Sequence, residues 1–327
     1  MSSKEFDGVL VFSEMHDVAL EVLSKGRELV DQLNTKLCAI SCGGEASGKA
    51  SEYIAHGADK VFTLRDPHLD RFHVESYTEA MTRLIEEEKP RIVLMGATKR
   101  GKELAPRVAQ RLGVGCETEC LDLRVEDGGL VIERLIFGGK AISTEAFQVE
   151  PQIATIPPKR FEKLDRDESR RGDVVEFTVE VGEPKLRLLE TREREVGKVK
   201  IEDAEVIVSV GRGFKKKEDI KLAEELADVL GGVCIGCSRP IAADLKWLSE
   251  DHWVGLSGHK VRPKLYIALG ISGQVQHLAG MRDSNVIVAI NRDPDAPIFK
   301  AADYGINDDL YSVVPELTNA FKKLLGR

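Results

Sequence analysis

The 327-residue sequence lacks both a long apolar segment and an excess of positive charge. Its longest stretch without a formal charge, residues 265–281, is interrupted by Gln274, Gln276 and His277, so it cannot cross a bilayer. Lys and Arg number 47 against 55 Asp and Glu, which gives a net charge of −8. Nucleic-acid affinity depends on clustered cations that release counterions. We therefore expect neither an integral membrane protein nor a nucleic-acid-binding protein.

Targeting segments and the cysteine arrangements of common metal centres are also missing. Lys4, Glu5 and Asp7 precede the first strand-like run, unlike a signal or transit peptide, so we expect a cytoplasmic protein whose cysteines are thiols. The pairs Cys116/Cys120 and Cys234/Cys237 could together form a four-thiolate zinc site, but they fall in different predicted domains. The closely spaced cysteines of a ferredoxin module are absent. We expect no bound metal. The pairs are Cys38/Cys42, Cys116/Cys120 and Cys234/Cys237.

Short apolar runs alternate with longer amphipathic runs in the first part of the chain, as is typical of a parallel sheet covered by helices on both faces. The predicted strands are 9–12, 37–41, 61–64 and 92–96, and the predicted helices are 18–33, 46–56, 76–88 and 102–112. Between residues 121 and 181, short β-like pieces such as 130–137 and 174–181 are separated by glycine and proline pairs. We interpret these pieces as an antiparallel extension of the first domain.

The alternation stops in the charge-dense segment 182–203 and then begins again, so we place a domain boundary near residue 195. The predicted elements of the second part are 206–210, 218–230, 266–269, 274–281, 286–290 and 315–325. The expected fold class is α/β, with two doubly wound, mostly parallel-sheet domains. The first, 1–195, has the antiparallel extension, and the second, 196–327, is Rossmann-like.

Two glycine-rich turns match phosphate-binding motifs incompletely. Residues 43–50 fit the phosphate loop G-x-x-x-x-G-K-[ST] except that Ala50 has no hydroxyl for Mg²⁺, which favours a flexible turn. An adenine-nucleotide-binding regulatory module is the alternative there. Residues 211–213 (GRG) follow a predicted strand, but Lys216 stands at the third glycine position of the dinucleotide fingerprint and the ribose-binding acid is missing. The motif therefore predicts a tight turn whose backbone amides and Arg212 could bind an anion. An NAD-dependent oxidoreductase remains the alternative function.

A third turn, at residues 270–277, is more specific. A buried strand ends in Ser272-Gly273 and a helix begins at once, so its first backbone amides are exposed and suit an anionic phosphate. Gln276 and His277 lie in the first helical turn. This is the carboxyl end of a strand, where doubly wound sheets bind ligands.

The second domain carries a series of short sequence motifs that together resemble a known family. They are 211–213 (GRG), 238–240 (SRP), 254–258 (VGLSG), 265–273 (LYIALGISG), 276–281 (QHLAGM), 288–291 (VAIN), 293–299 (DPDAPIF) and 302–305 (ADYG). In the first domain they are 96–98, 101–102, 106–109 and 151–155. The second domain closely resembles, over its whole length, the flavin-binding half of the electron-transfer flavoprotein alpha subunit, and the first domain resembles that subunit more loosely.

This resemblance implies an FAD held mainly by the second domain, with its diphosphate near Ser272-Gly273. It also implies that His277 and Arg239 place positive charge beside the pyrimidine side of the ring and raise its reduction potential. Ser257 replaces the family's commoner Thr but keeps a hydroxyl for flavin N5. The residues implied to surround the flavin and its chain are Arg212, Ser238, Arg239, Val254, Gly255, Leu256, Ser257, Ser272, Gly273, Gln274, Val275, Gln276 and His277, and those at the adenosine end are Asn291, Asp309 and Leu310.

Members of the family are heterodimers, so the resemblance implies a beta subunit that docks on the first domain. That subunit would carry AMP or, in electron-bifurcating versions, a second FAD, and residues 43–50 are then expected to bind no nucleotide. The expected function is an FAD-containing electron carrier. It passes single electrons between a dehydrogenase of the acyl-CoA type, the beta subunit and a flavin or quinone acceptor. Catalysis is implied only within a bifurcating complex. The sequence of residues 237–240 (CSRP) departs from the commoner form in the family and leaves open whether the flavin serves simple carriage or bifurcation.

Overall fold

The computed structural model describes residues 5–44, 46–137, 139–186, 189–190, 200–231 and 233–326. The chain divides into two compact units, residues 1–191 and 192–327. The boundary expected near residue 195 lies outside the described residues. Each unit has a parallel sheet of its own with an apolar core on both faces.

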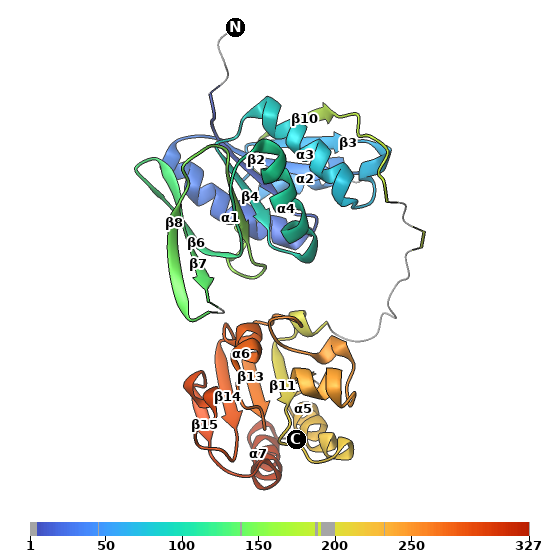
Figure 1. Ribbon diagram of the computed structural model, residues 1–327, viewed down its shortest axis with the longest axis vertical. Helices are drawn as coiled ribbons and strands as arrows, with labels where there is room; N and C mark the ends of the chain where they lie inside the picture. Colours follow the sequence, from blue (N-terminus) through green and yellow to red (C-terminus); the bar gives the residue numbers. More distant parts are fainter. Residues whose placement is uncertain are drawn as a thin grey trace. The chain divides into compact units, whose positions relative to one another are not determined.

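The first unit contains a seven-stranded parallel sheet in the order β10-β3-β2-β1-β4-β9-β5. Its strands are β1 (Val9–Phe12), β2 (Leu37–Cys42), β3 (Lys60–Arg65), β4 (Ile92–Gly96), β5 (Cys116–Glu117), β9 (Gln152–Ile156) and β10 (Asp173–Thr178). Helices α1 (His16–Leu33) and α2 (Ala46–Ala55) cover one face, and α3 (Val74–Glu88) and α4 (Lys99–Leu112) cover the other (Figure 1). Central strands such as β1 are buried on both faces, which explains their unbroken apolar runs. The doubly wound prediction is confirmed.

A separate antiparallel sheet extends this unit. It consists of β6 (Cys120–Glu126), β7 (Gly129–Ile136) and β8 (Ala141–Ala146). The prediction for residues 130–137 is therefore confirmed, but the one for residues 174–181 is wrong, because β10 pairs parallel with β3 at the edge of the large sheet. An edge strand is exposed on alternate residues, so its pattern is the same as that of an antiparallel strand.

The second unit has a five-stranded parallel sheet in the order β12-β11-β13-β14-β15. The strands are β11 (Val206–Val210), β12 (Cys234–Cys237), β13 (Leu265–Leu269), β14 (Val286–Ile290) and β15 (Tyr304–Ile306), and the helices are α5 (Lys221–Val229), α6 (Val275–Met281) and α7 (Leu310–Leu325). Alternate residues of β13 face opposite sides: Ile267 and Leu269 pack with α5 and α7, and Tyr266 and Ala268 pack with α6.

Two helices begin three or more residues earlier than their periodicity predicts, because a capping residue sets the start. Thr98 accepts a hydrogen bond from Gly101 N (2.9 Å), so α4 begins at Lys99 instead of residue 102. Asp309 accepts one from Tyr311 N (3.0 Å), so α7 begins at Leu310 instead of residue 315.

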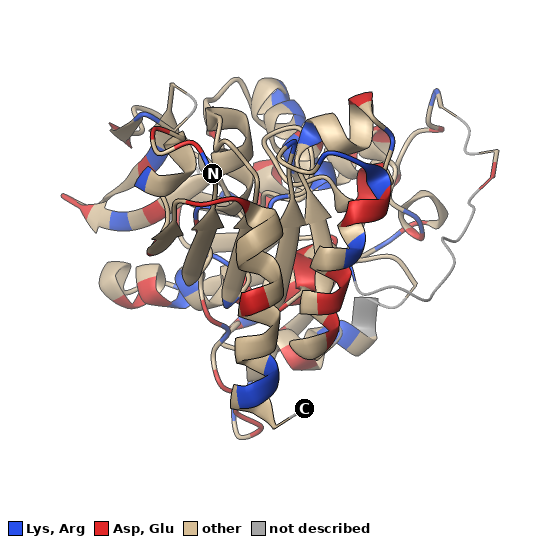
Figure 2. Cartoon of the chain, turned by 90° about the horizontal axis from the view of Figure 1, so that it is seen from below, with Lys and Arg blue, Asp and Glu red and all other residues tan. Residues whose placement is uncertain are grey.

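Acidic and basic residues are interspersed along the helices and loops (Figure 2). In the part of the chain that the structure describes, no helix has both the length and the apolar character needed to cross a bilayer.

Candidate functional site

The loops that follow β11 and β13 meet at the carboxyl edge of the second sheet. The chain continues from β11 to β12 on one side, while β13 lies on the other, so this is the switch point where such sheets bind ligands. Gly211 N donates to Leu269 O (2.9 Å), and Gly213 N donates to Gly270 O (3.0 Å). A Cβ on Gly213 would lie 2.7 Å from the Gly270 Cα, so this approach of two backbones requires glycine.

The turn after β13 presents a row of free backbone donors. Within the described residues, the N–H groups of residues 272–276 hydrogen-bond to no acceptor. Gly273 holds the turn in shape at φ 78°, and a Cβ there would lie 2.4 Å from Ile298 N. Arg212 on the adjoining turn is exposed and makes no ion pair with the described part of the chain. Since α6 has only seven residues, the loop amides and Arg212 supply most of the positive potential, and they fit an anionic diphosphate.

The end of β12 lies beside the end of β11. Ser238 N donates to Val210 O at the end of β11 (3.0 Å), which places buried Ser238 and exposed Arg239 at the same sheet edge. The Arg239 guanidinium lies 5.8 Å from the centre of the Trp253 ring. The cation expected at this edge is therefore present and held against an aromatic face.

Residues 254–257 pack against the start of α6. Leu256 N donates to Gln276 O (2.7 Å), and a Cβ on Gly280 would lie 2.4 Å from Gly255 N, so a glycine in α6 lets this loop approach. Leu256 is 50% exposed and Val275 is 40% exposed. Two exposed apolar side chains beside free polar donors fit a flat ring system that carries a charged chain.

His277 differs from its expected role in one respect. Its imidazole is buried, and burial lowers its pKa to about 4, so the ring is neutral at pH 7 and the expected positive charge is absent from this chain alone. Its Nε2 lies 3.0 Å from the Tyr266 hydroxyl, and its Nδ1 is buried without a hydrogen bond of good geometry among the described residues, although the Val254 backbone partly opposes the lowering of its pKa. This orphaned nitrogen is a further feature that fits a bound FAD.

The three residues implied for the adenosine end lie at the same edge, with structural contacts of their own. Asn291 Nδ2 donates to Ile271 O (2.8 Å) and so ties the end of β14 to the turn after β13. Asp309 caps α7, and the buried Leu310 side chain lies beneath Gly213 and Gly270. All sixteen predicted residues thus come from loops or helix starts at one edge of the second sheet.

Sequence reasoning missed three residues. The Arg239 guanidinium lies over the Trp253 ring, the Tyr266 hydroxyl contacts His277, and Ser209 lies on β11 next to the strand that carries Tyr266. The available signal was a tyrosine and a serine within otherwise apolar strands, because buried polar groups need partners.

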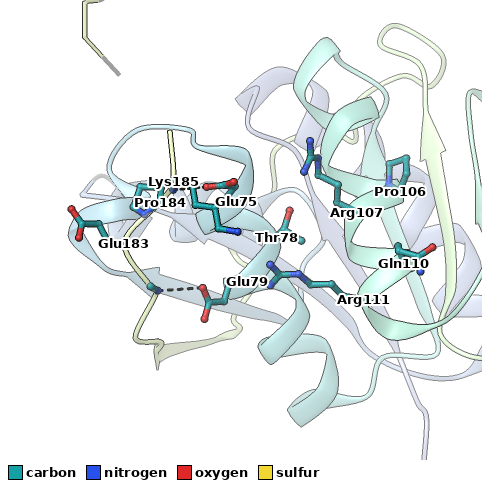
Figure 3. Close-up of a pocket in the computed structure, with 11 residues that line it drawn as sticks. Glu75, Thr78, Glu79, Pro106, Arg107, Gln110, Arg111, Glu183, Pro184 and Lys185 are labelled. Carbon is teal, nitrogen blue, oxygen red and sulfur yellow. Dashed lines mark hydrogen bonds between the residues drawn. The ribbon is translucent and has the colours of Figure 1, made fainter. Parts of the chain in front are cut away.

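The first unit contains a pocket that is separate from the candidate edge of the second sheet. It has a volume of about 490 Å³ and lies between α3, α4 and residues 182–185 (Figure 3). Glu75 accepts a hydrogen bond from Lys185 N (2.7 Å) and Glu79 accepts one from Gly182 N (3.2 Å), so these carboxylates fix a chain segment against α3. None of the predicted FAD-binding residues lines this pocket.

Both units of the chain match known protein families. Residues 10–181 match the electron transfer flavoprotein domain, and residues 200–282 match the electron transfer flavoprotein FAD-binding domain. The chain is 40% identical to the electron transfer flavoprotein subunit alpha of Thermoanaerobacterium thermosaccharolyticum, over 98% of this chain and 99% of the relative. The corresponding subunit of Megasphaera elsdenii is also 40% identical, over 100% and 99%. The acryloyl-CoA reductase electron transfer subunit beta of Anaerotignum propionicum is 36% identical, over 97% and 96%.

These matches cover both units, and they do not favour the NAD-dependent alternative, whose glycine fingerprint is also incomplete. The two family models and the nearly full-length relatives lead to one assignment: the chain belongs to the electron transfer flavoprotein alpha-subunit family, carries electrons, and has FAD as its cofactor.

Proposed function

We propose that this chain is the FAD-bearing half of a two-subunit electron carrier in the cytoplasm. The observation that carries the proposal is the row of free N–H groups at residues 272–276 beside Arg212. These groups would hold the diphosphate, because amides and a guanidinium already oriented toward an anion need no reorganisation to bind it. When bound, FAD supplies a ring that accepts two electrons and can release them one at a time.

The remaining residues of the edge would shape the surroundings of the ring. Leu256 and Val275 would cover apolar surface and keep water away from it, and the Ser257 hydroxyl would offer a hydrogen bond. Arg239 would supply the positive charge, since His277 is neutral. A cation in a partly desolvated pocket stabilises added negative charge and so raises a reduction potential.

The proposed partners follow from the relatives. One relative is named as an electron transfer subunit of an acryloyl-CoA reductase, which supports a redox partner of the acyl-CoA type. We also propose a beta subunit, docked on the first unit, that carries AMP or a second FAD. All six cysteines are free thiols, which supports a reducing compartment.

The test is to purify the full chain with any subunit that accompanies it and to count the flavins. One FAD in the complex indicates simple carriage, two indicate bifurcation, and a colourless protein that binds NADH would contradict the proposal. Arg239→Gln is expected to lower the flavin reduction potential by an amount on the order of tens of millivolts. Lys322→Gln, in the last turn of α7, is the control and should leave the potential unchanged.

A further inference from the structure

The loop that carries Arg212 is attached to the start of α7 by a network of three hydrogen bonds. Lys215 N, three residues after Arg212, donates to the Tyr311 hydroxyl (2.7 Å). That hydroxyl donates to Asp219 Oδ2 (2.6 Å), and the same carboxylate oxygen accepts from Lys216 N (3.2 Å). Tyr311 therefore joins two parts of the second unit that are far apart in the sequence.

The direction of each hydrogen bond in this network follows from the atoms themselves. A backbone N–H can only donate, so the Tyr311 oxygen accepts from Lys215 N. An ionised carboxylate can only accept, so the hydroxyl hydrogen of Tyr311 points to Asp219. A phenylalanine at position 311 would break both of these bonds and leave the ring in place.

The Tyr311 ring also packs against the same loop. The Lys215 ammonium lies 4.9 Å from the centre of the ring, and the Phe214 ring meets it edge-on with the two centres 6.3 Å apart. The preceding residue, Leu310, lies so close that its Cδ2 would be 3.0 Å from a Cβ on Gly213. Two consecutive side chains at the start of α7 thus hold residues 213–216.

Arg212 depends on these contacts because both of its neighbours are glycines. Gly211 and Gly213 have backbone hydrogen bonds to the turn after β13 but no side chains that could pack and restrict the loop. The Arg212 side chain is exposed and makes no ion pair within the described part of the chain, so its own contacts do not orient it. Its direction is set by the segments on either side, which are β11 before it and the Tyr311 network after it.

We propose that Tyr311 is a positioning residue whose hydroxyl holds the loop on α7 and thereby orients Arg212 toward the diphosphate of FAD. The inference rests on the proposed function, because it takes Arg212 as a ligand of that diphosphate. Asp219 belongs to the same network as the acceptor of the Tyr311 hydrogen. A tyrosine that only stabilised the fold would affect FAD affinity equally whether or not residue 212 was an arginine.

The experiment is a double-mutant cycle on the full chain, with FAD affinity measured by fluorescence titration. Tyr311→Phe should bind FAD about three- to tenfold more weakly than wild type. In the Arg212→Gln background, the same change should alter FAD affinity by less than about twofold, because the side chain to be oriented is gone. An equal loss in both backgrounds, or no loss in either, would overturn the inference and leave the proposed function standing.

Tyr304→Phe is the matched control, because it removes a tyrosine hydroxyl of the same unit at the amino end of β15, where Tyr304 is 66% exposed. It should leave FAD affinity unchanged.

Asp219→Ala tests the network without altering Tyr311, and it keeps the inference testable if Tyr311→Phe fails to fold. It should weaken FAD binding in the same direction, and again only when Arg212 is present. Tryptophan fluorescence during urea unfolding checks that the second unit of each variant is folded. A wild-type chain that takes up no FAD would overturn the proposed function instead.

Discussion

The two parallel sheets are both doubly wound, but the backbone N–H groups at their carboxyl edges differ in whether the unit itself supplies an acceptor. In the first unit, Glu14 follows β1 and its Oε1 accepts a hydrogen bond from the Thr98 hydroxyl (2.6 Å) at the end of β4. Thr98 also accepts from Gly101 N, and a Cβ on Gly101 would lie 1.8 Å from Gly96 O, so α4 packs directly onto the end of its strand. The side chains of this unit thus occupy its own switch point.

In the second unit, the N–H groups of the corresponding turn after β13 find no acceptor in the described part of the chain. Two glycines bring the loops after β11 and β13 together without placing a side chain above them. The difference teaches that a doubly wound sheet provides a location for a ligand, and that the loops decide whether the location is open.

The largest expected effect comes from closing the open edge. In Gly273→Val, the new Cβ would meet Ile298 N at 2.4 Å, and the residue would have to keep a φ of 78°. The turn should rearrange, and FAD affinity should fall by about a hundredfold or more in a fluorescence titration.

The matched control for this variant lies in the first unit. Gly48→Ala places a methyl group on α2 with nothing within 4 Å, so it should leave FAD affinity unchanged and stabilise α2 slightly. Equal FAD affinity in Gly273→Val and wild type would refute the assignment of this turn.

A smaller effect is a loss of unfolding free energy at low pH, which we expect in the second unit. The pKa of His277 is lowered by burial to about 4 from its usual 6.5, so the unfolded chain binds a proton between these values that the folded chain does not. Stability is complete above pH 6.5 and is lost as the pH falls toward 4, by about 3 kcal/mol in the FAD-free second unit.

Urea unfolding at pH 7 and pH 4 measures this loss. Tryptophan fluorescence reports the second unit alone, because both tryptophans, Trp247 and Trp253, lie there. His277→Gln, which cannot titrate, should lose less stability over the same range. If wild type and variant lost the same amount, acid sensitivity would have to come from other groups.

The smallest effect compares the two capping residues. Thr98 is buried and bonds both Glu14 and the first turn of α4, whereas Asp309 accepts one hydrogen bond at the start of α7. Thr98→Ala should cost about 2 kcal/mol of unfolding free energy in the first unit, and Asp309→Ala about 1 kcal/mol in the second. Circular dichroism follows the first transition and tryptophan fluorescence the second. Equal losses would show that the Glu14 contact adds nothing.

The sequence allowed most residues of the candidate edge to be predicted. Glycines at positions 211, 213 and 273 mark places where a backbone approach or a positive φ is required, and such requirements are local. The same local reasoning gave incorrect starts for α4 and α7, because periodicity does not show which polar residue caps a helix. It also misassigned β10, since the pattern of a half-exposed strand does not reveal its partner.

The sequence by itself determined the alternation of strands and helices, the glycine turns and the family, because these depend on residue type and order along the chain. Only the tertiary structure decided that the turns after β11 and β13 face each other, that the first unit closes its own switch point, and that Tyr266 lies against His277. Charge depends on surroundings, and burial among neighbours far apart in sequence makes His277 neutral.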